Sequence, residues 1–138
     1  MEQLAVEIVG LCREYGECRV EVERMEEARR VKNALESVCS MARQRLDISD
    51  PALLLALLDA CEVTRDEGML QEVLDVVGRN LDRLAVSAES VKLLACCYYY
   101  VEEEECVERA GRMLEELRKM GRGEEELADV ETILEELT

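Results

Sequence analysis

The sequence predicts an all-α fold, on the basis of one apolar run and a scarcity of turn residues. The run Ala52–Cys61 is apolar except for Asp59 and has no β-branched residue, which favours a helix over a strand. Its ten residues are too few to cross a bilayer, which takes about 18. One proline and seven glycines in 138 residues are few for a chain with many turns. We therefore expect about seven helices in a single domain, 1–138. They would form three antiparallel hairpins and a C-terminal helix, stacked as a short superhelix or an irregular bundle.

Residues 1–46 are expected to form the first and longest hairpin. Apolar residues recur at helical spacing over 2–15 and predict a helix there. Gly16 is suited to the end of this helix. The apolar residues are Leu4, Ile8, Leu11 and Tyr15. A break is favoured near Gly16–Val20, while continued apolar spacing leaves one long helix over 2–46 as the alternative. The following stretch, 21–46, predicts an amphipathic helix whose polar face is the only basic-leaning one in the chain.

The second hairpin, 49–84, begins at a capping signal. Asp50 or Ser49 can cap the central helix, and Pro51 suits its first turn, where no backbone N–H is needed. This helix is expected to end near Val63, with a narrow polar stripe made by Asp59, Glu62 and Asp66. Gly68 is predicted to mark the turn into a helix over about 69–84.

The third hairpin, 87–120, follows a second capping signal at Ser87. A helix over about 88–102 is expected to bury one face, consisting of Val91, Leu94, Cys97, Tyr98 and Val101. A helix over about 104–120 would end at Gly121. A last helix is expected over 124–137.

The second and third hairpins read as an internal repeat. A shift of 38 residues places Ser49 on Ser87 in the first helix, and the shift becomes 37 in the second helix. A helix-turn-helix repeat of about 36–38 residues is typical of a solenoid. The alternative is an irregular helical bundle, because any pair of amphipathic helices imitates such a repeat.

Within this repeat, the run Leu94-Ala95-Cys96-Cys97-Tyr98 resembles the leucine-small-x-x-aromatic pattern of tetratricopeptide repeats, and Ala110 and Gly111 resemble the small residues of their second helix. The resemblance covers about 49–120. The chain departs from the family in having no tryptophan, a repeat longer than about 34 residues and no proline between hairpins except Pro51. The resemblance implies a concave face that binds peptides or partner helices, without catalysis.

The charge is strongly acidic and unevenly distributed. The formal net charge is −16, with −1 over 1–46, −6 over 47–100 and −9 over 101–138. Such a chain is repelled by the phosphates of nucleic acids and by anionic membranes, so we expect no direct contact with either. The acidic C-terminal third favours a basic protein partner or head-to-tail association into a homo-oligomer. The alternative is a solvated face that keeps the protein soluble.

The triplet Tyr98-Tyr99-Tyr100 supplies the candidate partner-binding residues. Successive helix positions differ by about 100°, so the three rings cannot share one face. Tyr98 is expected in the core, Tyr99 on the polar side with Lys92 and Glu103, and Tyr100 on a flank. Tyrosine is enriched at interfaces, so Tyr99 and Tyr100 are predicted anchors, with Lys92 and Glu103 beside them. The alternative is one core tyrosine and two amphipathic surface tyrosines.

Seven cysteines occur without any histidine or C-x-x-C motif, which argues against a metal site or a nucleophilic cysteine. They are expected to be small buried hydrophobes, with a disulfide between Cys61 and Cys97 as the alternative. The N-terminus has no basic leader or long apolar core, so a cytoplasmic location is expected. Disulfides are rare in cytoplasmic proteins except in hyperthermophiles, so their presence would indicate a hyperthermophile source. The composition favours the same source, with only two Asn and three Gln, and with fourteen Arg against three Lys.

No catalytic constellation is visible. The glycines form no phosphate-binding loop, so no nucleotide or other cofactor is predicted. The run Glu102–Glu105 reads as a solvated helix start. We therefore expect a non-catalytic protein–protein interaction or assembly module. The alternatives are a structural subunit of a larger nucleoprotein or viral assembly and, less favoured, an enzyme that uses carboxylates.

Overall fold

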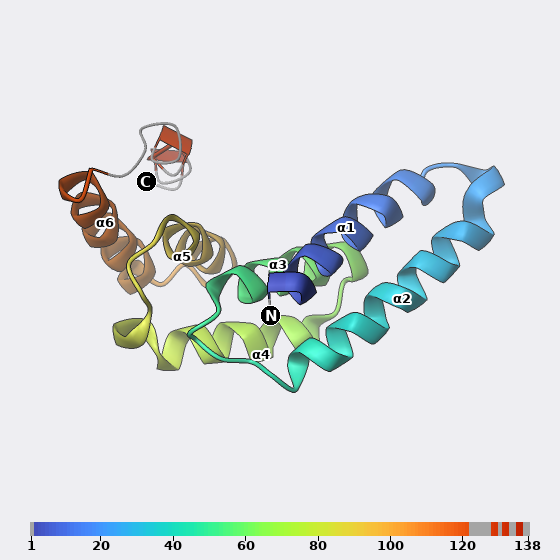
Figure 1. Cartoon of the computed structure of the whole chain (residues 1–138), viewed down its shortest axis with the longest axis horizontal. Coiled ribbons are helices and arrows are strands. Elements are labelled where there is room, and N and C mark those ends of the chain that lie inside the picture. Colours follow the sequence, from blue (N-terminus) through green and yellow to red (C-terminus); the bar gives the residue numbers. More distant parts are fainter. Residues whose placement is uncertain (1, 122–127, 130, 133–134, 137–138) are drawn as a thin grey trace. The chain divides into compact units, whose positions relative to one another are not determined.

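The structure, a computed structural model, describes residues 2–121, 128–129, 131–132 and 135–136, and most of these residues are helical. No strand occurs among them, which confirms the all-α class. Two 3-10 helices, Val22–Arg24 and Leu81–Arg83, lie in the connections (Figure 1). The α-helices are α1 (Glu2–Cys18), α2 (Met25–Arg43), α3 (Pro51–Thr64), α4 (Glu67–Arg79), α5 (Ala88–Val101) and α6 (Glu104–Lys119). The predicted helix over 124–137 falls largely outside the described residues.

Two compact units, 1–73 and 74–138, have their own internal contacts. The boundary between them falls within α4. The single domain expected over 1–138 stays a prediction.

In the first unit, α1 packs against both α2 and α3 (Figure 1). The chain breaks between α1 and α2, where Glu21 has an extended backbone, so a single helix over 2–46 is wrong. Helix α1 continues past Gly16 to Cys18, which is fully buried. A helical glycine costs about 1 kcal/mol relative to alanine, which burial of a side chain in the next turn readily offsets.

Helix α3 is buried on nearly every side, as the apolar run predicts. Its buried residues are Leu53, Leu54, Ala56, Leu57, Leu58, Ala60 and Cys61. Asp59 and Glu62 are exposed and form the polar stripe. Of the two predicted caps, Asp50 is the one used, because its carboxylate accepts a hydrogen bond from the backbone N–H of Leu53 at 3.2 Å.

The turn after α3 lies at Arg65 and Asp66, so its predicted position at Gly68 is wrong. Arg65 adopts a left-handed backbone with φ 58°. The Asp66 carboxylate accepts a hydrogen bond from the N–H of Met69 at 3.0 Å and so begins α4 at Glu67, which leaves Gly68 inside the helix. Asp66 therefore belongs to the start of α4 and not to the polar stripe of α3.

Helix α4 ends at Arg79, five residues before the predicted end at 84. The side-chain amide of Asn80 donates a hydrogen bond to the carbonyl of Val76 at 2.7 Å, and a 3-10 helix follows. Leu84 is nevertheless buried, so the apolar spacing continues beyond the α-helix itself.

In the second unit, α5 packs against α6. Ser87 caps α5 as predicted, and its hydroxyl accepts a hydrogen bond from the N–H of Ser90 at 3.1 Å. Val101 was expected on the buried face but is 40% exposed, because α5 ends at this residue and the chain turns away. Gly121, with φ 69°, follows the end of α6.

The helix starts of α3–α4 and α5–α6 are related by a constant shift of 37 residues. Helices α3 and α5 are each 14 residues long and follow capping residues at 50 and 87. A left-handed residue follows each, at Arg65 and Glu102, and the next helices begin at Glu67 and Glu104. The shift of 38 predicted for the first helices is therefore one residue too long, since Asp50 and not Ser49 corresponds to Ser87.

Candidate interaction surface at the end of α5

The last turn of α5 presents the three tyrosines in different directions. Tyr98 and Tyr100 are partly buried, whereas Tyr99 is 71% exposed. The rings of Tyr99 and Tyr100 meet edge to face, with centroids 5.2 Å apart and an angle of 86° between their planes. Tyr98 was expected in the core and lies only partly within it. The edge-to-face contact restricts the exposed ring of Tyr99, which lowers the entropy cost of using it as an anchor.

The turn that follows α5 is tight and acidic. The N–H of Glu102 donates a hydrogen bond to the carbonyl of Tyr98 at 2.7 Å, with Glu102 left-handed at φ 51°. Glu103 precedes α6 but its side chain makes no capping bond. The four glutamates Glu102–Glu105 are all exposed and form no ion pair with another described residue. The turn therefore offers unneutralised carboxylates beside an exposed aromatic ring.

The four predicted partner-binding residues are only partly brought together. Tyr99 and Tyr100 touch, and Glu103 is exposed in the adjoining turn. Lys92 lies seven residues before Tyr99, two helical turns away on the same face, and is partly buried. Lys92 and Glu103, both of which the structure describes, form no ion pair with each other.

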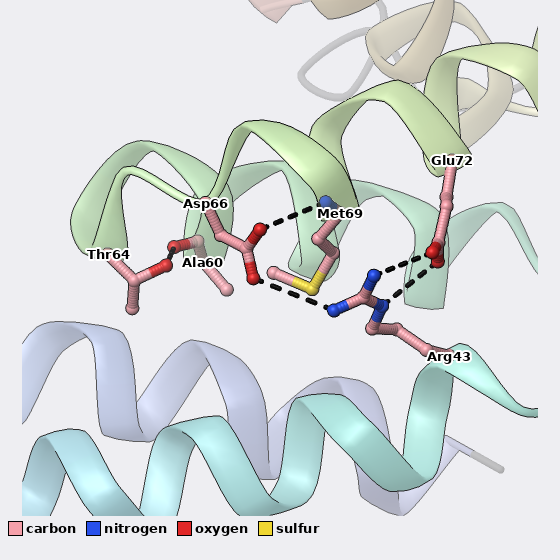
Figure 2. A network of polar contacts seen from close by, with 6 residues as sticks. All are labelled: Arg43, Ala60, Thr64, Asp66, Met69 and Glu72. Carbon is pink, nitrogen blue, oxygen red and sulfur yellow. Dashed lines mark hydrogen bonds and ion pairs between the residues drawn. The ribbon is translucent and has the colours of Figure 1, made fainter.

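A polar network in the first unit was missed at the sequence level (Figure 2). Arg43, in the last turn of α2, forms two hydrogen bonds with the carboxylate of Glu72 on α4, at 2.9 Å and 2.6 Å. The same guanidinium lies 3.6 Å from the carboxylate of Asp66, which also caps α4. Arg43 and Glu72 are 29 residues apart, so no local pattern pairs them. The capping role of Asp66 could have been predicted, because an aspartate directly before a segment with helical apolar spacing indicates the start of a helix.

This network holds α2 against the start of α4 with fixed charges. The hydrogen bonds from Arg43 lower the pKa of Glu72 below its ordinary value of 4.5, and the same contact raises the pKa of Arg43. Both groups are thus charged at neutral pH. A proton-transfer group works best with a pKa near the operating pH, which neither partner has. The network is accordingly a structural contact between α2 and the start of α4.

Three buried thiols come from the three packed helices of the first unit. Burial raises the pKa of Cys12 and Cys39 to about 11 and that of Cys61 to about 12. Cys97, buried in α5, also has a raised pKa because of burial. All seven cysteines, each within the described part of the chain, are thiols in the structure. The pairing of Cys61 with Cys97 is therefore not formed here and stays a prediction.

Within the described ranges, no three cysteine, aspartate or glutamate side chains are grouped so as to hold a metal ion. Over the same residues, no helix combines the length and the apolar character needed to cross a membrane.

No protein-family model, curated protein or solved structure matches the chain.

Proposed function

We propose that this protein is a non-catalytic interaction or assembly module that binds a protein partner through the end of α5 and the α5–α6 turn. One observation carries the proposal: Tyr99 is 71% exposed in the last turn of α5, and Val101, the last residue of that helix, is 40% exposed. Exposed aromatic side chains at a helix end are costly to leave in water and are enriched at protein interfaces.

The surroundings of Tyr99 support a partner with basic groups. The turn contributes four successive carboxylates that are not neutralised by any described residue. A cation from a partner would relieve the repulsion among them. An arginine has a further advantage, because its guanidinium also stacks on the face of a tyrosine ring.

The correspondence between α3–α4 and α5–α6 supports a repeat architecture for this module. The first helices of the two segments have the same length, and their capping residues and left-handed residues lie at the same relative positions. A helical repeat would have these features. We include in the proposal that these segments are copies of one 37-residue helical unit, similar to a tetratricopeptide repeat.

The test compares the wild type with Tyr99→Ala, Tyr100→Ala and their combination. Each protein is immobilised and used for affinity capture from extracts of the cell that produces it, and self-association is measured in parallel by size exclusion with light scattering. The control is Tyr15→Ala, because Tyr15 is a partly buried tyrosine of the first unit. We expect the partner, or the oligomer, to be lost with the Tyr99 variants and kept with the control. Equal capture and equal association by all of the folded variants would contradict the proposal.

A further inference from the structure

Two buried cysteines of the second unit lie on the two helices that pack against each other. Cys97 is on α5 and is 2% exposed, and Cys106 is on α6 and is 3% exposed. The helices are joined by a turn of only two residues, Glu102 and Glu103. Cys97 lies five residues before this turn and Cys106 three residues after it. The tight turn therefore brings the two cysteines to nearly the same level of the hairpin.

The two thiols are close enough for each to influence the other's ionisation. Burial raises the pKa of the Cys97 thiol, and the charge of Cys106 raises it further. Cys106 has a larger effect than Cys96, although Cys96 is adjacent to Cys97 in the chain. The thiol across the hairpin is therefore a near neighbour of Cys97 in the interior of the second unit.

The other hairpin shows that these two positions meet. At the shift of 37 residues, Cys97 corresponds to Ala60 on α3, and Cys106 corresponds to Met69 on α4. Ala60 and Met69 are both buried, and the side chain of Met69 extends toward Ala60 (Figure 2). A hairpin of this shape thus brings together the side chains at the two positions. In the second unit both side chains are thiols, which can be joined covalently.

We propose that Cys97 and Cys106 are a redox-active thiol pair that closes into a disulfide across the α5–α6 hairpin. The oxidant is a low-molecular-weight disulfide such as oxidised glutathione. One cysteine loses its proton to solvent and attacks a sulfur of the oxidant, which forms a mixed disulfide and releases one glutathione thiol. The second cysteine, also deprotonated, attacks the protein sulfur of the mixed disulfide and releases the other glutathione. The protein loses two electrons and two protons, and the oxidant is reduced to two thiols.

The dimensions of packed helices allow this bridge. The axes of two packed helices are about 8–10 Å apart, and each Cα atom lies about 2.3 Å from its axis. Facing Cα atoms can therefore come within the range of about 4.4–6.8 Å that is usual for disulfides. Both thiols are buried, so an oxidant reaches them only when the hairpin opens locally, and the reduced form is long-lived. This inference does not depend on the proposed function.

The experiment equilibrates the full chain with mixtures of reduced and oxidised glutathione, in native buffer and in concentrated urea. Remaining thiols are alkylated, and the chain is cleaved after glutamate. This cleavage separates Cys97, in the fragment 90–102, from Cys106, in the fragment 106–108. The test variants are Cys97→Ala and Cys106→Ala. The matched control is Cys96→Ala, which removes the neighbouring thiol from a different side of α5. Circular dichroism establishes that each variant is folded, and the wild-type result does not depend on the variants.

We expect the fragments 90–102 and 106–108 to be joined in the oxidised wild type and in Cys96→Ala, and to stay separate in the two test variants. The equilibrium constant for oxidation should be at least about tenfold larger in native buffer than in urea, because the fold holds the thiols together. The oxidised wild type should melt about 3 °C or more above the reduced protein, since the bridge constrains the unfolded chain. Excess reduced glutathione should reverse both effects.

Thiols at 97 and 106 that stay fully alkylatable in the native protein at every glutathione ratio would overturn the inference. A link from 90–102 to the fragment 37–62, which contains Cys61, would also overturn it, because a cysteine forms only one disulfide. Loss of the 90–102 to 106–108 link in Cys96→Ala would assign the bridge to the wrong thiol. An equilibrium constant no larger in native buffer than in urea would show that the fold does not hold the pair together.

Discussion

Replacing Leu54 in α3 by alanine should be one of the most destabilising truncations in the first unit. Leu54 is fully buried in the helix that is itself covered on nearly every side. Removing a buried leucine side chain costs about 2–5 kcal/mol, because the lost transfer free energy adds to the cost of the cavity that remains. That is a large share of a total stability of about 5–15 kcal/mol.

The neighbouring residue provides a matched control. Leu55 has the same side chain in the same helix but is partly exposed. Leu55→Ala removes the same atoms and changes helix propensity equally, so the difference between the two variants isolates burial. Urea unfolding followed by circular dichroism should place the midpoint of Leu54→Ala about 1–3 M lower than that of Leu55→Ala, for a slope of about 1–3 kcal/mol/M.

Leu54→Asp extends the same reasoning. An unpaired carboxylate at this site would have to be buried or would force the helix apart, and we expect loss of helicity at all urea concentrations. Equal and small losses in Leu54→Ala and Leu55→Ala, or a folded Leu54→Asp protein with an unchanged melting temperature, would show that α3 is peripheral. The assignment of the core to α3 would then be wrong.

Three further predictions follow from the caps, the ion pairs and the left-handed turn. Asp50→Ala should cost about 1 kcal/mol in urea unfolding, whereas Ser49→Ala should cost almost nothing, because only Asp50 caps α3. Arg43→Gln should lose at most about 1 kcal/mol at neutral pH, since the pair with Glu72 is partly exposed. The pKa of Glu72 is lowered in the folded protein, so this contribution is present above its ordinary value of 4.5 and disappears as the pH falls through the lowered value; unfolding at about pH 7 and pH 3 measures it. Glu102→Gly should raise the melting temperature, because glycine removes the left-handed backbone strain of roughly 1–2 kcal/mol at this position. A lower melting temperature would contradict this expectation. The same substitution should weaken association, because it removes a carboxylate from the turn.

Much of the fold could be predicted because its main signals are local. The caps at Asp50 and Ser87 and the apolar run of α3 each depend on residues within one or two helical turns. Capping and helical burial act over that range, so a sequence pattern contains the relevant information.

The predicted positions of turns were less accurate where they depended on glycine. Gly16 and Gly68 both lie inside helices. The cost of a helical glycine is about 1 kcal/mol, which a buried Cys18 or a cap from Asp66 outweighs. Gly121, at φ 69°, is the position where the expectation was correct.

Contacts between distant elements could not be derived from the sequence. Arg43 reaches Glu72 only because α2 and α4 are brought together by packing, and neither residue has a local feature that identifies the other. The exposure of Val101 is a similar case. It continues the apolar stripe of α5 in sequence, but the turn at Glu102 removes it from the core.

The two corresponding turns, after α3 and after α5, use their acidic residues differently. Arg65 and Glu102 share the left-handed conformation, so that feature is common to both turns. The next positions differ. Asp66 caps α4 and also pairs with Arg43, whereas Glu103, at the corresponding position, makes no capping bond and no ion pair with a described residue. The carboxylate of Asp66 therefore has two roles within the fold, a helix cap and an ion pair. The carboxylate of Glu103 has neither role, which leaves it available to a cation from another molecule.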